Sequence, residues 1–300
     1  MSKVQDKNAG FQRPLIFGEV LFDCFPDGRK ILGGAPFNVA WHLQGLGLRP
    51  LLCTSVGADF MGQQVKQEMR DWGMDLSGVQ TNSRFPTGMV SVRFDNGQPA
   101  YDILADQAYD YLDVDFSTQH LASEPASLIY HGSLALRSPQ GQKVFERLAS
   151  TLGSPIFLDL NLREPWWQRK QIEDFMRRAR WVKLNDQELF EIHGTSQTGM
   201  DGIKSAAQEV FEKYQLQWLI VTLGEQGAFV VTRDGITEGK AVKAKPLVDT
   251  VGAGDAFSAV TIAGILAGWP IGIILDKALA FAAAICGQRG ATSKNPALYQ

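Results

Sequence analysis

The sequence has 300 residues, of which 45% are hydrophobic and 20% charged, the balance of a globular protein rather than of a disordered or fibrous chain. Its 29 basic and 32 acidic residues give a formal net charge of -3, so no broad cationic surface exists for nucleic acid or an anionic membrane. Small soluble molecules are therefore the expected partners. The three cysteines, Cys24, Cys53 and Cys286, lie far apart and lack paired spacing, which favours reduced thiols and a cytoplasmic location.

Residues 1–13 are polar and include Lys3, Lys7 and Arg13, and no apolar run of signal-peptide length follows them. We expect them to form a flexible N-terminal tail, followed by one large domain over residues 14–300. The most apolar stretch, residues 256–269, is shorter than the roughly 20 residues that a membrane span needs. We interpret it as a buried core helix.

Strand and helix patterns alternate along the chain. Residues 15–24 are a β-rich run that ends in a Pro-Asp-Gly turn at 26–28, and residues 37–46 then carry apolar side chains at helical spacing. Residues 51–56 predict another strand and residues 60–72 an amphipathic helix. Further short apolar strands are predicted at 128–131, 156–160, 181–184 and 218–222. This alternation predicts an α/β fold, a doubly wound and mostly parallel sheet flanked by helices.

A hairpin interrupts the alternation. Residues 88–94 alternate apolar and polar side chains, Asp95-Asn96-Gly97 forms a turn, and residues 100–104 extend again. We predict a small β lid inserted at about residues 87–105. Such a hairpin would either cover a ligand or pair with another subunit, unless it is a surface decoration without a role.

Residues 249–257, with the sequence DTVGAGDAF, carry the clearest chemical signal. Gly252, Ala253 and Gly254 have almost no side chain, so their amides can converge at the start of the following helix and bind a phosphate. Asp255 would lie in the first helical turn, where the dipole favours its ionised form. If the anion is a migrating phosphoryl group, we expect this carboxylate to remove the proton of the attacking hydroxyl. The alternative is that Asp255 only caps the helix while the glycines form a turn.

Two glycine-rich patterns, in this order, resemble the signatures of a known family. Residues 249–259 closely resemble the C-terminal signature of the ribokinase-like (PfkB) carbohydrate kinases. Residues 33–40, with the sequence GGAPFNVA, resemble the N-terminal signature, and Gly47 and Gly57 follow at the spacing of the family. The resemblance runs from about residue 15 to residue 296. It implies a ribokinase-like fold and an ATP-dependent kinase that phosphorylates a hydroxyl of a small sugar.

The resemblance also implies where the nucleotide and a metal ion bind. The sequence NDQE at residues 185–188 matches the Asn-x-x-Glu pattern that organises magnesium and phosphate, so Glu188 is the expected metal-linked carboxylate. Residues 222–227 resemble the family's Thr-x-Gly-x-x-Gly loop. Taken without the resemblance, these two segments would be a helix cap and a strand-end turn. The residues expected to contact ATP are Asn185, Thr222, Gly224, Gly227, Gly252 and Gly254.

The same resemblance places the sugar near the early glycines. Asp23, Gly33, Gly34 and Asn38 would hold it, because a carboxylate and an amide can bind vicinal hydroxyls while adjacent glycines leave room for a ring. For Asp23 alone, formation of the turn at residues 26–28 is the alternative explanation.

A further pattern favours fructose among the possible sugars. Residues 159–163, with the sequence DLNLR, resemble the Asp-x-Asn-x-Arg of fructokinase-type members, in which Arg163 would face substrate or phosphate. The pairs Gly18-Glu19 and Thr87-Gly88 favour the same members. An exposed surface arginine is the alternative for Arg163.

One departure from the family pattern concerns a monovalent cation. In members that such an ion activates, a serine usually stands four residues beyond the glycine of a C-terminal Gly-Ala pair. Here Lys294 occupies that place after Gly290-Ala291, and Ser293 stands one residue earlier. This departure argues against potassium activation. The resemblance further suggests a homodimer formed through the lid, with a monomer as the alternative because monomeric relatives exist.

Other functions remain to be weighed against this interpretation. No GxGxxG follows the first strand, which argues against a dinucleotide-binding oxidoreductase, and no Walker motif occurs, which argues against a P-loop enzyme. Ser133 lacks the GxSxG context of a typical hydrolase nucleophile. Ribose, 2-keto-3-deoxygluconate or a nucleoside could replace fructose. A non-catalytic sugar-binding regulatory protein on the same fold is the alternative from another class.

Overall fold

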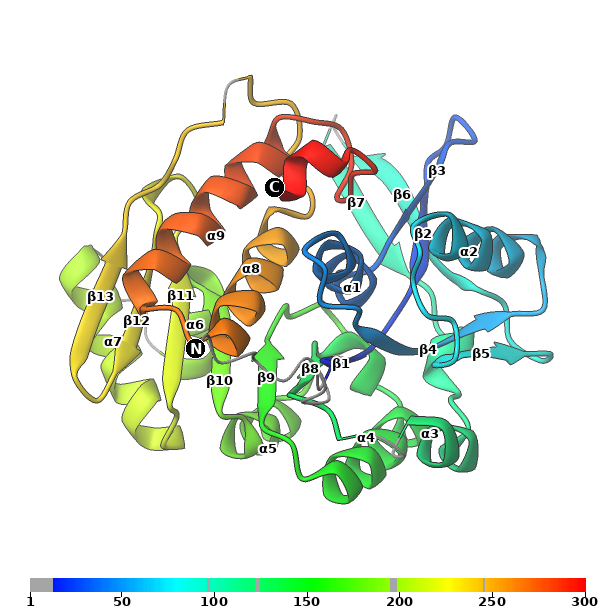
Figure 1. Cartoon of the computed structure of the whole chain (residues 1–300), viewed down its shortest axis with the longest axis horizontal. Helices are drawn as coiled ribbons and strands as arrows, with labels where there is room; N and C mark the ends of the chain where they lie inside the picture. The colour runs from blue at the N-terminus through cyan, green and yellow to red at the C-terminus, as the bar shows by residue number, and fades with distance from the viewer. Residues whose placement is uncertain (1–12, 96–97, 122–124, 195–198, 245) are drawn as a thin grey trace, which may run out of the picture.

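A nine-stranded sheet forms the centre of the protein (Figure 1). The structure is a computed structural model and describes residues 13–95, 98–121, 125–194, 199–244 and 246–300. All neighbours in the sheet are parallel except at one edge, where the last two strands run antiparallel. The doubly wound, mostly parallel sheet is therefore confirmed. In spatial order the strands are β13 (Gly235–Gly239), β12 (Ala228–Thr232), β11 (Trp218–Thr222), β10 (Trp181–Asn185), β9 (Ile156–Asp159), β8 (Ile129–His131), β1 (Leu15–Phe17), β4 (Leu51–Gly57) and β5 (Val79–Asn82).

Helices cover both faces of this sheet, as Figure 1 shows. One face is covered by α1 (Ala35–Gly45), α2 (Phe60–Asp71), α8 (Ala253–Ala267) and α9 (Ile271–Cys286). The other face is covered by α3 (Val114–Leu121), α4 (Pro139–Leu152), α5 (Arg169–Arg178), α6 (Asp186–His193) and α7 (Met200–Tyr214).

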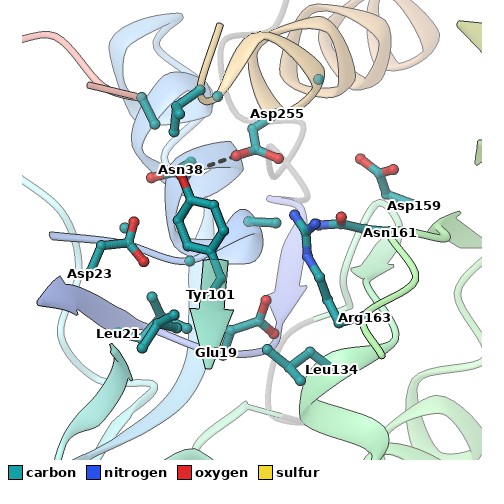
Figure 2. A pocket seen from close by; sticks show the side chains of 18 of the residues that line it. Glu19, Leu21, Asp23, Asn38, Tyr101, Leu134, Asp159, Asn161, Arg163 and Asp255 are labelled. Atoms are coloured by element: carbon teal, nitrogen blue, oxygen red, sulfur yellow. Dashed lines mark hydrogen bonds between the residues drawn. The ribbon is translucent and has the colours of Figure 1, made fainter. Parts of the chain in front are cut away.

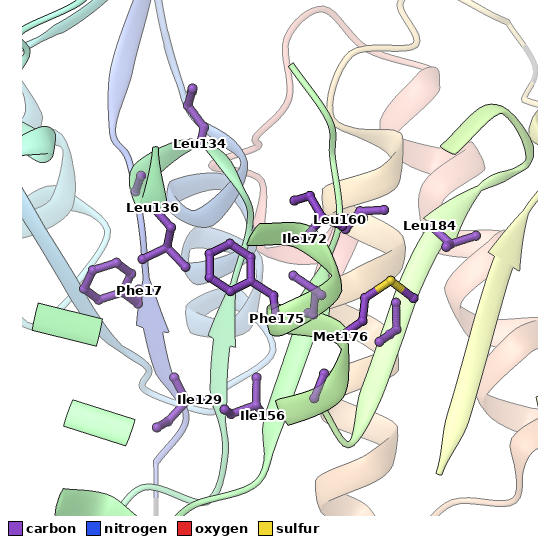
Figure 3. Packing of buried hydrophobic residues seen from close by; sticks show 14 of the residues in the cluster. Phe17, Ile129, Leu134, Leu136, Ile156, Leu160, Ile172, Phe175, Met176 and Leu184 are labelled. Atoms are coloured by element: carbon purple, nitrogen blue, oxygen red, sulfur yellow. The ribbon is translucent and has the colours of Figure 1, made fainter. Parts of the chain in front are cut away.

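Strand residues alternate between two hydrophobic cores. Leu15 and Phe17 of β1 pack in the core under α4 and α5, whereas Ile16 packs in the core under α1 and α8. Figure 3 shows the first of these cores, in which Phe175 and Met176 of α5 lie over the sheet. Because both faces are buried, the strands in the middle of the sheet are mostly apolar, which explains the short hydrophobic runs in the sequence.

The predicted strand over residues 15–24 is wrong in one respect, since it is two strands in two different sheets. β1 ends at Phe17, and β2 (Leu21–Cys24) begins after three intervening residues, in a second sheet. Gly18 sits at the break, where a Cβ atom would lie only 2.2 Å from Cγ of Pro36. The apolar run continues through Val20, Leu21 and Phe22, so the sequence pattern alone did not show the change of direction between the two strands.

The predicted hairpin belongs to a second sheet, which we call the lid and which is wider than the prediction. Its four strands are, in order, β3 (Lys30–Gly33), β2, β6 (Gly88–Asp95) and β7 (Gln98–Ile103). β6 pairs with β7 and β2 pairs with β3 in the antiparallel sense, while β2 pairs with β6 in parallel. Residues 96–97 of the predicted turn lie outside the described residues.

At the N-terminus, residues 1–12 of the predicted tail lie outside the described residues. Arg13 is anchored, because its Nη1 atom lies 2.5 Å from Oδ2 of Asp75. The predicted core helix over residues 256–269 corresponds to α8, whose residues from Ala256 to Gly264 are buried. None of the helices in the described part of the chain has both the length and the apolar character that crossing a bilayer requires.

Candidate active site

A cavity of about 660 Å³ lies between the lid and the carboxyl ends of the central strands. Ligands of open α/β sheets bind at this end of the strands, because the loops that follow successive parallel strands meet there. Most of the residues predicted from the sequence reach it. Those that line the cavity are Asp23, Gly33, Gly34, Asn38, Arg163, Asn185, Glu188, Thr222, Gly252, Gly254 and Asp255, whereas Ala253, Gly224 and Gly227 do not.

Asp255 is held in the wall of the cavity by Asn38. It lies in the first turn of α8, and its Oδ2 atom accepts a 2.8 Å hydrogen bond from Nδ2 of Asn38 on α1. Figure 2 shows the carboxylate turned into the cavity towards Arg163. A carboxylate fixed in this way is oriented to accept a proton from a bound hydroxyl.

The ionisation of Asp255 differs from the expectation based on the helix dipole. Loss of hydration, together with the nearby Asp159 carboxylate, raises the pKa of Asp255 to about 7, although the Asn38 hydrogen bond, Lys183 and Arg163 oppose the shift. Burial therefore outweighs the helix terminus. A pKa close to neutrality suits a general base, which must both accept and release a proton.

Free backbone amides lie beside this carboxylate. Gly252 takes φ 81° ahead of the first helical residue, and a Cβ atom there would lie 2.5 Å from Cα of Ala291. The amide of Ala253 donates to the carbonyl of Thr250 at 3.3 Å, so it is not a free donor as predicted. The amides of Gly254 and Asp255 donate to no acceptor of the described residues. They are the donors that the helix start offers to an anion.

The lid end of the cavity carries several carboxyl groups. Glu19 and Asp23 line it together with Tyr101 of β7, and the exposed Arg163 reaches in from the opposite side (Figure 2). Burial raises the pKa of Glu19 to about 7, and burial opposed by the Arg163 charge raises the pKa of Asp23 to about 6. Gly34, at φ 106°, allows the chain to approach Glu19, since a Cβ atom there would lie 2.7 Å from the carbonyl oxygen of Glu19.

The two residue pairs that favour fructokinase-type members, Gly18-Glu19 and Thr87-Gly88, differ in their positions relative to the cavity. Glu19 lines the cavity, whereas Thr87 and Gly88 do not. Thr87 is buried, its Oγ1 atom donates to Oδ1 of Asp59, and its amide donates to Oδ2 of the same carboxylate. Thr87 therefore holds the turn before the lid.

Asn185 and Glu188 form a reciprocal cap on α6. The amide of Glu188 donates to Oδ1 of Asn185, and Oε2 of Glu188 accepts from the amide of Asn185 at 2.9 Å. Oε1 of Glu188 accepts from the amide of Leu162 at 2.8 Å. The capping alternative for Asn185 is thus realised, and Glu188 additionally holds the loop that follows β9.

The described residues contain no group of three or more His, Cys, Asp or Glu side chains placed to hold a metal ion. Both oxygens of Glu188 already accept amide hydrogen bonds, and burial raises the pKa of its carboxyl group. The donor set does not fit a metal cage made of protein ligands alone. Magnesium commonly keeps water and substrate phosphates as ligands instead.

The loop at residues 222–227 approaches the cavity through Thr222 only. Thr222 ends β11, and its hydroxyl donates to the carbonyl of Leu184 at 3.4 Å. Gly224 opens a short 3-10 turn, and Gly227, at φ 100°, closes it. A Cβ atom on Gly227 would lie 2.3 Å from the carbonyl oxygen of Gly239, so this glycine is required by packing.

Lys183 is a site residue that the sequence analysis missed. It is buried in β10, lines the cavity, and its Nζ atom lies 2.8 Å from Oδ1 of Asp159. The second oxygen of Asp159 accepts from the hydroxyl of Ser258 at 2.6 Å. The Nζ atom also lies 3.5 Å from the position that a Cβ atom on Gly254 would take. A lysine within an apolar strand was the available signal, because buried lysines are rare without a partner.

The ion pair of Lys183 with Asp159 brings a positive charge to the start of α8. Burial would lower the pKa of Lys183, but the charge and hydrogen bond of Asp159, together with the charges of Glu188 and Asp255, outweigh burial and raise the pKa, so the amine stays charged. The cavity therefore holds a cation, free helix amides and an oriented carboxylate close together. This combination can bind a phosphoryl group and deprotonate a hydroxyl beside it.

Comparisons with known proteins agree with this arrangement. The family model described as pfkB family carbohydrate kinase matches residues 23–298. The probable fructokinase-5 of Arabidopsis thaliana is 30% identical to this chain over 318 residues, which cover 95% of this chain and 94% of that protein. The fructokinase of Salmonella typhimurium is 27% identical over 295 residues, which cover 93% of this chain and 93% of that protein. Fructokinase from Vibrio cholerae O395, in its fructose, ADP and calcium ion bound form, has a TM-score of 0.81 at 26% identity and covers 96% of this chain and 98% of its own. The fold is ribokinase-like, and the chain belongs to the pfkB family of carbohydrate kinases.

Proposed function

We propose that this carbohydrate kinase transfers the γ-phosphoryl group of ATP to a hydroxyl of fructose. The relatives named fructokinase and the solved fructokinase with bound fructose and ADP support this choice of substrates. The resemblance of the sequence DLNLR at residues 159–163 to fructokinase-type members also supports it, and Arg163 lines the cavity.

The observation that carries the proposal is the placement of Asp255 beside free helix amides at the cavity wall. The sugar hydroxyl gives its proton to the Asp255 carboxylate as its oxygen forms a bond with the γ-phosphorus. The bond between that phosphorus and the bridging oxygen breaks, and ADP leaves with the electron pair. Asn38 keeps the carboxylate in position during this transfer.

The phosphoryl charge is stabilised by groups that are fixed before reaction. The amides of Gly254 and Asp255 and the Lys183 amine face the position in which it would lie. We place the ATP phosphates along Asn185, Thr222, Gly252 and Gly254, with Gly224 and Gly227 shaping the loop behind Thr222. Magnesium, held by the triphosphate and water, would neutralise phosphate oxygens, with Glu188 acting on it through water.

A panel of sugars and nucleosides, assayed for ADP release, tests the function. The panel comprises fructose, ribose, 2-keto-3-deoxygluconate and a nucleoside, each with ATP and magnesium. Fructose is expected to give the highest kcat/KM. A higher value for another member would replace fructose as the substrate. Binding of sugars without any ADP release would instead support the non-catalytic regulatory alternative.

We also propose a homodimer formed through the lid. β3 and β7 are the outer strands of the lid sheet in the described part of the chain. The outer edge of such a strand can pair with a strand of another chain. Light scattering of the purified protein distinguishes a dimer from a monomer. The cytoplasmic location remains a prediction from the cysteines.

A further inference from the structure

His42 is a fully buried residue of α1 and lies one helical turn after Asn38. Residues four positions apart lie on the same side of a helix, so the two side chains share one face of α1. Asn38 donates to Asp255 (Figure 2), whereas Nε2 of His42 lies 2.9 Å from the carbonyl oxygen of Ala291. One face of α1 therefore contacts both the proposed base and the segment that follows α9.

The protonation state of His42 follows from its surroundings. Burial lowers the pKa of His42 to about 4, although the bond to Ala291 opposes the shift, so the ring is neutral at neutral pH. A carbonyl oxygen has no hydrogen to give, so Nε2 carries the ring hydrogen and donates it to Ala291. Nδ1 is then an acceptor, and the hydroxyl of Tyr299 lies 3.1 Å from it. Each ring nitrogen thus faces a polar group of the chain.

Ala291 is in direct contact with the start of α8. It is 5% exposed and lines the cavity. A Cβ atom on Gly252 would lie 2.4 Å from Cβ and 2.5 Å from Cα of Ala291, so the two backbones touch. The neighbouring amide of Gly290 also donates to Oδ2 of Asp249 at 3.2 Å. Because packed segments transmit strain, a displacement of Ala291 would move Gly252 and the free amides that follow it.

The chain just beyond Ala291 is held by α1 as well. Nε1 of Trp41 donates to the carbonyl of Ser293 at 2.8 Å, and the hydroxyl of Tyr299 lies 3.1 Å from the same carbonyl oxygen. Tyr299 belongs to a short 3-10 turn, η4 (Pro296–Tyr299). The segment that backs the start of α8 is therefore fixed at two of its carbonyl groups.

From these contacts we infer that His42 is a positioning residue for phosphoryl transfer. By holding Ala291 it fixes Gly252 and with it the free amides at the start of α8, while Asn38 on the same face of α1 orients Asp255. The inference rests on the proposed function and adds to it a residue that does not line the cavity. Loss of this support should therefore lower kcat much more than it weakens substrate binding.

Steady-state kinetics with ATP and fructose test the inference in two variants of His42. His42→Leu keeps a side chain of similar size but removes the donor to Ala291, so kcat should fall about tenfold to a hundredfold while each KM stays within about threefold. His42→Gln can return an N–H donor to the same carbonyl and should restore kcat to within about threefold of wild type. Unchanged kcat in His42→Leu, or equal losses of kcat in the two variants, would overturn the inference.

Tyr299→Phe and Trp72→Phe are a matched pair beside His42. Tyr299→Phe keeps the ring but loses the hydroxyl next to Nδ1 of His42, whereas Trp72→Phe loses an N–H that donates to the carbonyl of Trp41. We expect kcat to fall about threefold to tenfold in Tyr299→Phe, and to stay within about twofold in Trp72→Phe even where its melting temperature is lower. If His42→Leu does not fold, this pair tests the inference, and equal kcat values in both variants would overturn it.

Hydrogen exchange separates this inference from the choice of substrate, because it needs no sugar. The amide of Ala256 donates to the carbonyl of Gly252 at 2.9 Å, so its exchange reports how firmly the start of α8 is held. Exchange at Ala256 should be about tenfold faster in His42→Leu and within about twofold of wild type in Trp72→Phe. If the wild-type protein does not phosphorylate fructose, the choice of substrate fails, while faster exchange in His42→Leu leaves this inference standing. Unchanged exchange in His42→Leu would overturn it.

Discussion

Nδ2 of Asn38 donates a 2.8 Å hydrogen bond to Oδ2 of Asp255, although the two residues are 217 positions apart in the sequence. Each lies near the start of a helix, and a glycine with positive φ precedes each helix, Gly34 at 106° and Gly252 at 81°. The bond joins the segment predicted to hold the sugar to the segment predicted to hold the phosphate. In the proposed function, this one contact would couple sugar binding to the orientation of the base.

The pH dependence of turnover should report Asp255. The carboxylate must be ionised to accept a proton, and burial raises its pKa to about 7, so kcat/KM should fall as the pH drops below about 7. Because the Asn38 hydrogen bond lowers this pKa, Asn38→Ala should move the fall in rate to higher pH. Rate profiles of both proteins between about pH 5 and about pH 9 provide the measurement. A rate that stays constant down to about pH 5 would show that burial does not perturb this group, because a carboxyl group with the ordinary pKa of 3.8 is still ionised there.

The raised pKa of Asp255 also predicts how the stability of the folded protein depends on pH. A carboxyl group whose pKa is higher in the folded than in the unfolded state contributes stability below the unfolded pKa of 3.8, and this contribution is lost as the pH rises through about 7. Asp255→Asn removes the ionisation, so at pH 8 it should raise the free energy of unfolding by on the order of 2 kcal/mol and at low pH change it little. Urea denaturation at the two pH values measures the difference. Asp276→Asn, at an exposed position of α9, is the control and should show no pH-dependent gain.

Alanine substitutions of the glycines at the two ends of α8 distinguish the effect of backbone strain on stability from an effect on catalysis. Gly252 and Gly268 have φ values of 81° and 67°, but only at Gly252 would a Cβ atom collide, 2.5 Å from Cα of Ala291. Gly268→Ala should cost about 1–2 kcal/mol of stability and leave kcat unchanged. Gly252→Ala should also displace the helix start and lower kcat by about a hundredfold. Equal kinetics in the two variants would contradict a catalytic role for this end of α8.

The Lys183–Asp159 pair should influence both stability and rate. Lys183→Met leaves the Asp159 carboxylate buried without its cation, which should cost about 3–5 kcal/mol, and it should lower kcat by about a hundredfold. Adding Asp159→Asn removes the unpaired charge and should restore most of the stability but not the rate. Chemical denaturation and kcat of the single and double variants test this separation. Recovery of kcat together with stability would mean that the pair is structural only.

Local sequence patterns predicted those parts of the site that depend on local geometry. The Gly-Ala-Gly-Asp segment predicted a helix start with an acid in its first turn, and α8 places Asp255 there. Asn185 and Glu188 lie on one turn of α6, so their capping pattern is visible in the sequence. In both cases the residues that interact are close in the sequence.

Features that depend on distant contacts were missed. The parallel pairing of β2 with β6, which widens the lid, joins segments that are far apart in the chain. The ion pair of Lys183 with Asp159 also arises only when β10 lies beside β9. The ionisation of Asp255 depends on burial by neighbouring elements, which reversed an expectation based on its own helix.

Phosphoryl transfer by Asp255→Asn in a single turnover tests the central claim most directly, because asparagine keeps the shape of the side chain but cannot accept the proton. With saturating ATP, magnesium and fructose, the account predicts a rate at least about a thousandfold below wild type and a fructose dissociation constant within about twofold of it. A single-turnover rate close to that of the wild-type protein would contradict the assignment of Asp255 as the base.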